Sequence, residues 1–408
     1  MHVRRRLLSV AVATCFVAGL GTVVPSASAE TVPVAGSVVP AQDPFYAQPT
    51  NIGTYVPGQV IASRSYSANL FGGSSVVNAW QISYRTNDSH DQPVIGVTTL
   101  IVPKAAWYGS GSRPVVSVQL PEDATGSQCA PSYTIARGND AQGFGIAGRL
   151  LSMGWAVAVP DFEGPGSHYT AGPLAGHTVL DGIRAVRNFG PGGIGASNKW
   201  ALDGYSGGAQ ATGWAAELQP SYASEITLAG AAMGGTPADL AAVGRYLDGG
   251  MAAGFEFAAA WGISKEWPES GIDDILNDQG RANFAAVEGK CVGDILTSSS
   301  FKKLADGSTV ADPLNHPPVK AVLDLNKLGK AAPSTPIYNY HAITDEIVPV
   351  GQADTLVSDW CAEGATVMKV RNPLGEHVME AFVQTPAVIA WLTSRFNDVT
   401  PINTCGIY

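Results

Sequence analysis

The order of apolar and polar positions predicts strands early in the chain and alternating strands and helices after them. Residues 77–84 alternate apolar and polar side chains, and residues 94–102 and 114–120 are rich in β-branched side chains, so all three runs are typical of strands. Further strands are expected at 155–159, 200–203 and 226–231, with helices at 148–152, 180–187 and 209–218. This order predicts a mostly parallel sheet with helices on both faces and an antiparallel leading edge.

A long stretch without strand signals interrupts this alternation between about residues 234 and 330. Helices are expected there at 238–247, 251–260, 272–287 and 319–328. Strands return at 336–340 and 367–370, and a final helix is expected at 386–396. We interpret the interruption as a helical cap over an active site. A separate helical domain with no role in the site is the alternative, because the chain is long enough for two domains.

The first residues have the three parts of a secretory signal. Arg4, Arg5 and Arg6 precede an apolar run, and the small residues Ala27-Ser28-Ala29 follow it where a signal peptidase would cut. A membrane anchor is the alternative, but the apolar run is short and a cleavage site follows it. We therefore expect a secreted protein with no transmembrane segment after cleavage. Its parts are a signal peptide at 1–29, a core at 30–233 and 331–408, and a cap at 234–330; residues 30 to about 75 are expected to form an extended arm.

Charge and cysteine content restrict the function further. Cleavage would remove three arginines and no acidic residue, which changes the formal net charge from −10 to −13. An acidic protein without a basic cluster is a poor binder of nucleic acid. Four cysteines remain, and an even number in an exported protein indicates two disulfides. Three pairings are open; we favour Cys361–Cys405, which would tie down the C-terminal tail, and Cys129–Cys291. A zinc site is not favoured because there is no C-x-x-C pair, and no metal is expected.

The motif Gly204-Tyr205-Ser206-Gly207-Gly208 fits G-x-S-x-G and lies between a predicted strand and a predicted helix. A serine at such a sharp turn projects its hydroxyl from a strained backbone. The flanking glycines avoid clashes in the turn, and the helix N-terminus places a positive dipole near a developing oxyanion. We therefore predict that Ser206 is a nucleophile. An ordinary turn serine is the alternative.

A serine nucleophile needs a base, and in chains with this motif an acid and then a histidine follow the serine. Three histidines follow it here, namely His316, His341 and His377. His377 is the predicted base, in a loop after the strand at 367–370, whereas His341 is interpreted as a packed residue at a strand end. Asp345 is the predicted acid that orients the imidazole. Its neighbour Glu346 is interpreted as a solvated or gate residue.

An oxyanion needs two donors. One is expected to be the backbone N–H of Gly207, and the other should come from the loop at 121–125. Several segments, taken together, resemble the secreted lipases of the Candida lipase A type, within the α/β-hydrolase superfamily. These segments are Glu122-Asp123-Ala124-Thr125, Cys129-Ala130-Pro131-Ser132-Tyr133, Leu180-Asp181-Gly182-Ile183-Arg184-Ala185, Gly204-Tyr205-Ser206-Gly207-Gly208-Ala209, Gly234-Gly235-Thr236-Pro237, 341–349 and Glu376-His377.

The resemblance covers about residues 45 to 405. It implies an α/β-hydrolase fold whose helical cap is inserted after the strand that follows the nucleophile helix. It assigns the triad to Ser206, Asp345 and His377, and the oxyanion positions to Asp123 and Gly207. It also implies the two favoured disulfides.

The activity implied by this resemblance is cleavage of carboxylic esters, including triacylglycerols, without a cofactor. A lipid ester is the expected substrate, and a lipid–water interface is the expected place of reaction. Two alternatives remain open. One is an exported serine peptidase on the same fold, for which Asp161 and Glu163 could supply an acidic pair, although a structural role suits that loop better. The other is an inactive surface-binding protein, against which the intact order of serine, aspartate and histidine argues.

Overall fold

The computed structural model describes residues 32–68, 76–138 and 141–407 of the 408-residue chain. The chain divides into two compact units, Met1–Val32 and Pro33–Tyr408, and the second holds all the elements described below. The predicted signal peptide lies outside the described residues. In the part of the chain that is described, no helix is both long and apolar enough to span a membrane.

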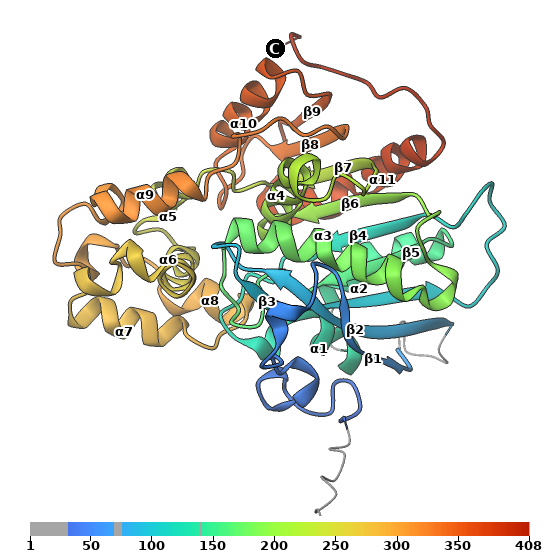
Figure 1. The fold of residues 1–408 in the computed structure, drawn as a ribbon. Coiled ribbons are helices and arrows are strands. Elements are labelled where there is room, and N and C mark those ends of the chain that lie inside the picture. Colours follow the sequence, from blue (N-terminus) through green and yellow to red (C-terminus); the bar gives the residue numbers. More distant parts are fainter. Residues whose placement is uncertain (1–31, 69–75, 139–140, 408) are drawn as a thin grey trace, which may run out of the picture. The chain divides into compact units, whose positions relative to one another are not determined.

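The second unit is built on one nine-stranded sheet with strand order β1-β2-β3-β5-β4-β6-β7-β8-β9 (Figure 1). The strands are β1 (Val60–Tyr66), β2 (Val77–Asn87), β3 (Pro93–Pro103), β4 (Val115–Gln119), β5 (Ala156–Pro160), β6 (Trp200–Tyr205), β7 (Leu228–Gly234), β8 (Ile337–Ala342) and β9 (Val367–Asn372). The strand pairs β1–β2, β2–β3 and β3–β5 are antiparallel, and all the other pairs are parallel. The predicted mostly parallel sheet with an antiparallel edge is therefore confirmed.

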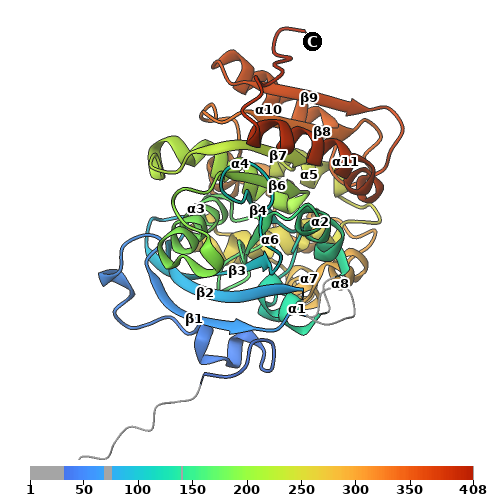
Figure 2. The ribbon, with the colours of Figure 1, turned by 90° about the vertical axis from the view of Figure 1, so that its right-hand side faces the viewer.

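Helices cover both faces of the sheet (Figure 2). One face packs against α3 (Gly172–Phe189), α4 (Gly207–Tyr222) and α10 (Val350–Ala362), and the other against α1 (Pro131–Arg137), α2 (Ala141–Ser152) and α11 (His377–Phe396). Successive side chains of a strand enter opposite cores, as Leu202 and Ala201 of β6 do. Every residue of β4, β5 and β6 is buried, because both faces of these central strands are covered.

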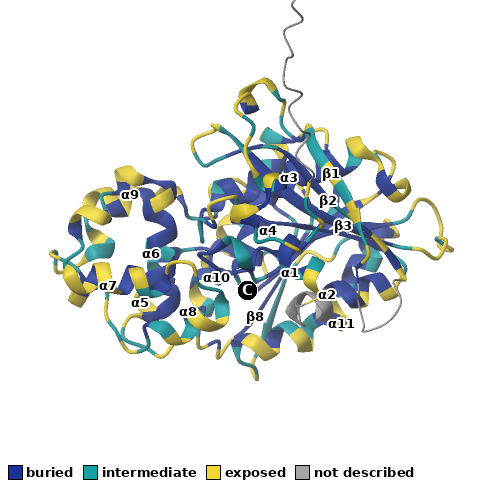
Figure 3. Cartoon of the chain, turned by 90° about the horizontal axis from the view of Figure 1, so that it is seen from below, coloured by how far each residue is buried: buried dark blue, intermediate teal, exposed yellow. Residues whose placement is uncertain are grey.

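A group of helices lies between β7 and β8 along the chain. These are α5 (Leu240–Leu247), α6 (Gly254–Glu266), α7 (Asp278–Val287), α8 (Val292–Ser298) and α9 (Pro317–Leu325). Their inward faces form a third apolar core, which also includes Leu174 of α3 and Val348 after β8 (Figure 3). We call α5 to α9 the cap helices. The predicted insertion of helices at this point is confirmed, whereas its boundaries at 234 and 330 stay a prediction.

Several local predictions were wrong. The expected extended arm contains β1, which pairs with β2. The expected helix at 272–287 is interrupted at Leu276, whose backbone is extended, and α7 starts afresh where the side chain of Asn277 accepts from the N–H of Gly280. The last helix starts at His377 rather than near 386, because Glu376 caps its first N–H groups and the helix continues through Pro386.

Two disulfides tie distant segments together. Cys129–Cys291 joins the turn before α1 to the start of α8, and Cys361–Cys405 joins α10 to the C-terminal tail. Both favoured pairings are thus present. Beside the first bond, the backbone N–H of Thr125 donates to the carbonyl of Lys290 at 2.9 Å. The cap helices are therefore fixed to the loop that follows β4.

Candidate active site

Ser206 lies at the turn between β6 and α4 with φ 55° and ψ −126°. Residues other than glycine rarely adopt this backbone conformation, so the surrounding structure must hold Ser206 in place. The N–H of Ser206 donates to the carbonyl of Gly234 at 2.9 Å. A Cβ atom on Gly208 would lie 2.0 Å from the carbonyl oxygen of Gln119, so the turn needs glycine there. The motif thus forms the strained corner that the sequence predicted.

The structure brings Ser206, His377 and Asp345 together. Nε2 of His377 lies 2.8 Å from Oγ of Ser206, and Nδ1 of His377 lies 2.7 Å from Oδ2 of Asp345. The other carboxylate oxygen of Asp345 accepts from the backbone N–H groups of Ile347 at 3.0 Å and Val348 at 2.7 Å. Because Oδ2 of Asp345 faces Nδ1, that nitrogen carries the proton of a neutral ring and Nε2 is free to accept the serine proton.

The carboxyl group of Asp345 is held ionised. Burial by itself would raise its pKa, but the imidazole groups of His341 and His377 outweigh burial and hold the pKa well below its usual range. His341 is fully buried at the end of β8, and its Nε2 lies 2.9 Å from the carbonyl oxygen of Val348 and 3.3 Å from Oδ2 of Asp345. The interpretation of His341 as a packed strand-end residue missed its contact with the acid. Its position four residues before Asp345 was the available signal.

The backbone of His377 is fixed from two sides. The hydroxyl of Tyr205 donates to its carbonyl oxygen, and its N–H donates to Oε2 of Glu346 at 3.0 Å. His377 is the first residue of α11, so the sequence-based placement in a loop was wrong. Glu346 is exposed, as expected of a solvated residue, but its carboxylate also accepts the backbone N–H of His377. Sequence reasoning gave no sign of either contact, because each joins segments far apart along the chain.

Asp123 lies in the loop after β4, opposite the start of α4. Its backbone has φ 42°, and a Cβ atom on Gly207 would lie 2.0 Å from its Oδ1. The carboxyl group is buried, and Oδ1 has no hydrogen-bond partner among the described residues. Burial raises its pKa to about 7, although the nearby imidazole of His377 acts in the opposite direction. The side chain of Asp123 therefore changes charge near neutral pH beside Gly207.

Behind this loop lie the two acids considered for a peptidase site. Glu163 is buried and accepts from the backbone N–H of Ala124 at 3.2 and 3.3 Å. Asp161 is buried and accepts from the N–H and the hydroxyl of Ser132 at 2.8 and 2.6 Å. Both carboxyl groups support the core. In the described part of the chain, no group of three or more His, Cys, Asp or Glu side chains is arranged to hold a metal ion.

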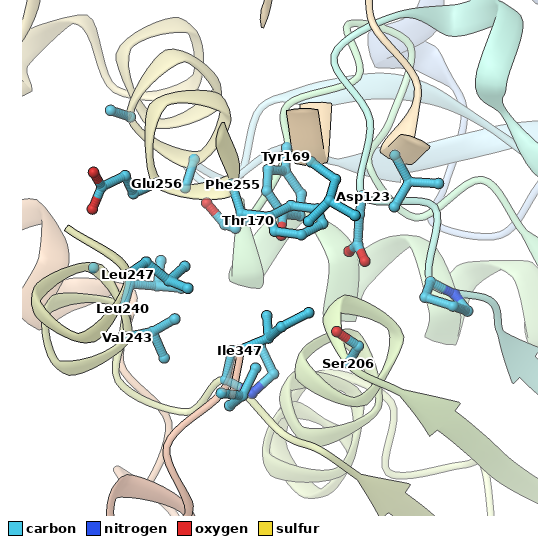
Figure 4. Close-up of a pocket in the computed structure, with 18 of the residues that line it drawn as sticks. Asp123, Tyr169, Thr170, Ser206, Leu240, Val243, Leu247, Phe255, Glu256 and Ile347 are labelled. Atoms are coloured by element: carbon cyan, nitrogen blue, oxygen red, sulfur yellow. The ribbon is translucent and has the colours of Figure 1, made fainter. Parts of the chain in front are cut away.

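A cavity of about 290 Å³ extends from Ser206, His377 and Asp123 toward the cap helices (Figure 4). Its walls are mainly apolar and come from α5, α6 and the segments around them. They include Leu240, Val243, Leu247, Phe255, Ile263 and Ile347. One acidic residue of the cap helices, Glu256, also lines the cavity. The geometry thus joins a hydroxyl–imidazole–carboxylate chain to a space suited to an apolar group.

Exposed apolar side chains lie next to His377. Val378 and Phe382 of α11 line the cavity and are nevertheless 53% and 43% exposed. Other exposed apolar residues of the same region are Ile343, Leu374, Met379 and Val383. We call these six residues the α11 patch.

Comparison with known proteins identifies the family. A sequence profile described as secretory lipase matches residues 139–404. A lipase A of Moesziomyces aphidis is 34% identical over 387 residues, which cover 90% of this chain and 82% of that protein. A secreted triacylglycerol lipase of Malassezia globosa is 34% identical over 388 residues, with coverage of 89% and 81%. The crystal structure of Candida antarctica lipase A in its closed state superposes with a TM-score of 0.85 at 33% identity, covering 91% of this chain and 90% of that one. The chain therefore belongs to the secretory lipase family and has the α/β-hydrolase fold.

Proposed function

We propose that this protein is a secreted serine hydrolase that cleaves carboxylic esters, including triacylglycerols. The observation that carries the proposal is the unbroken chain from Oγ of Ser206 through the ring of His377 to Asp345, with distances of 2.8 and 2.7 Å. Membership of the secretory lipase family and the apolar cavity beside the serine support an ester with an apolar acyl group.

The first half of the reaction forms an acyl-enzyme. His377 takes the proton of Ser206 through Nε2 while Oγ bonds to the carbonyl carbon of the ester, and the carbonyl electron pair moves onto oxygen. The carboxylate of Asp345 stabilises the resulting imidazolium. When the tetrahedral intermediate collapses, the bond to the alcohol oxygen breaks and His377 returns its proton to that oxygen. The alcohol leaves, and the acyl group stays on Ser206.

The second half releases the acid. A water molecule gives its proton to Nε2 of His377 as its oxygen bonds to the acyl carbon, and the bond to Oγ of Ser206 then breaks with return of the proton. In both halves the oxyanion is held by the backbone N–H of Gly207 and by Asp123. The carboxyl group of Asp123 donates when protonated, which adds to its backbone N–H.

The substrate is delivered from a lipid–water interface. Two residues of the α11 patch, Val378 and Phe382, line the cavity while staying exposed, so the patch gives an aggregated lipid an apolar surface to contact beside His377. The peptidase alternative loses support because Asp161 and Glu163 are buried and bonded to the core. An inactive binding protein would have no use for the strained serine and its aligned base.

The proposal is tested by measuring hydrolysis of p-nitrophenyl acyl esters and of emulsified triacylglycerol. Aminoacyl-nitroanilides, which a peptidase would cleave, serve as the comparison. The wild type should release nitrophenol and fatty acid but no nitroaniline, and a fluorophosphonate probe should label it. Ser206→Ala should abolish labelling and hydrolysis, whereas the control Ser221→Ala, at the exposed end of α4, should keep both. Hydrolysis that survives in Ser206→Ala, or a wild type that cleaves only the nitroanilides, would refute the proposal.

A further inference from the structure

The apolar wall that α5 gives to the cavity is interrupted by a glycine. Positions three or four residues apart on a helix share one face, and the residues of α5 that line the cavity follow this spacing. They are Leu240, Val243, Gly244 and Leu247. Three of them carry branched apolar side chains, whereas Gly244, which is also buried, has only its backbone to offer. The wall therefore has a gap at this position, which we call the Gly244 notch.

Neither the backbone nor the packing of α5 requires a glycine at this position. Gly244 lies within the helix, and its φ is not in the left-handed region that favours glycine. Among the described residues outside the helix backbone, the nearest atoms to a Cβ atom there would be the two methyl carbons of Leu314, at 3.5 and 3.8 Å, which are ordinary contacts. Glycine in the middle of a helix also weakens the helix relative to alanine. The space left by the missing side chain is therefore a feature of the cavity and not a need of the helix.

The Gly244 notch lies in the part of the cavity that is remote from the nucleophile. Figure 4 shows the labelled side chains of α5 on the opposite side of the cavity from Ser206, with Ile347 between them. Leu314, which also lines the cavity, is the neighbour that borders the notch. An acyl chain bonded to Ser206 would thus pass Ile347 first and reach α5 only with its distal carbons.

We propose that Gly244 sets the length of the acyl chain that the enzyme prefers, because the notch receives the distal carbons of a long chain. Burial of one methylene group favours a bound state by about fourfold, so each carbon that enters the notch raises kcat/KM. Short acyl groups end before they reach the notch and do not depend on it. The inference rests on the proposed ester hydrolysis at Ser206 and adds the substrate class to it, namely esters of acids long enough to reach α5.

The test compares p-nitrophenyl esters of straight-chain acids, from about four to about sixteen carbons, in the wild type and in Gly244→Leu. A leucine side chain has about the volume of four methylene groups, so it displaces about four carbons of a chain in a close-packed cavity. The chain length with the highest kcat/KM should therefore be about four carbons shorter in Gly244→Leu. For the ester that the wild type prefers, kcat/KM should fall by about tenfold or more, and for the shortest ester by less than about twofold.

Further variants separate a loss of space from damage to the fold. Leu314→Ala in the Gly244→Leu background removes the methyl groups beside the notch and should move the optimum back by about two or three carbons. Gly351→Leu adds the same side chain at an exposed glycine of α10 that does not line the cavity, and it should keep the wild-type profile. If Gly244→Leu does not fold, Gly244→Ala, whose Cβ atom meets only ordinary contacts, should shorten the optimum by about one carbon.

Several results would overturn the inference. These are an unchanged optimum in a folded Gly244 variant, an equal loss of kcat/KM at every chain length, a wild type that prefers the shortest ester, and a double variant that hydrolyses long esters no better than Gly244→Leu. Absence of hydrolysis of every ester by the wild type would instead refute the proposed function, so the two failures are distinct.

Discussion

Replacing Asp123 by Asn tests whether a titrating carboxyl group shares the oxyanion site. Burial raises the pKa of Asp123 to about 7, and its side chain lies against Gly207, the other donor of the proposed site. Above that pH the group becomes an anion where the reaction develops a second negative charge. Asparagine has nearly the same shape, tolerates the φ of 42° and donates an N–H without changing charge.

The size of the effect follows from electrostatics. Two unit charges about 4 Å apart repel by about 4 kcal/mol at an effective dielectric constant of about 20, which slows a reaction by about a thousandfold. The ionised form is therefore nearly inactive, and the rate follows the neutral fraction of Asp123. With a pKa of about 7 that fraction is about one tenth at pH 8. Wild-type kcat/KM should thus fall about tenfold per pH unit above pH 7, and Asp123→Asn should stay nearly level.

The assay is the pH profile of kcat/KM for a short soluble ester at constant ionic strength, from about pH 6 to pH 9. Asp203→Asn is the matched control. Asp203 is a buried acid of β6 whose pKa burial also raises to about 7, but it does not line the cavity. It should retain the wild-type fall. If Asp123→Asn falls with pH as the wild type does, or if Asp203→Asn abolishes the fall, the electrostatic account of the oxyanion site is wrong.

Three further predictions concern the support of the site and the fold. His341→Gln keeps a donor near the position of Nε2 and should retain kcat within about threefold in steady-state kinetics. His341→Met has no donor there, and its kcat should fall about tenfold to a hundredfold. Equal losses of kcat in the two variants would exclude a role for the donor. Replacing Cys129 and Cys291 by serine opens a loop of sequence separation 162 and should lower the free energy of unfolding by about 5 kcal/mol, measured by denaturant titration. Burial raises the pKa of Asp203 in the folded state, so between about pH 5 and pH 7 the folded state binds more protons than the unfolded state, and the free energy of unfolding of the wild type should decline as pH rises. Asp203→Asn should remove about 2 to 3 kcal/mol of this decline, as denaturant titrations across that pH range would show. An unchanged dependence of the free energy of unfolding on pH would contradict this prediction.

The central strands and the serine corner were predictable because their signals are local. β4, β5 and β6 are short apolar runs bounded by turn residues, and their complete burial matches that pattern. Ser206 and its glycines act within five consecutive residues. β1 was missed because it is an edge strand with no fully buried residue, so its sequence has no apolar stripe to detect. The start of α11 was missed because Pro386 reads as a helix breaker, whereas the helix continues through it.

The parts of the site that could not be predicted depend on contacts between distant segments. The hydroxyl of Tyr205 and the carboxylate of Glu346 hold the backbone of His377 across 172 and 31 residues of sequence. The sequence order favoured Asp345 and His377 but said nothing about how either is held.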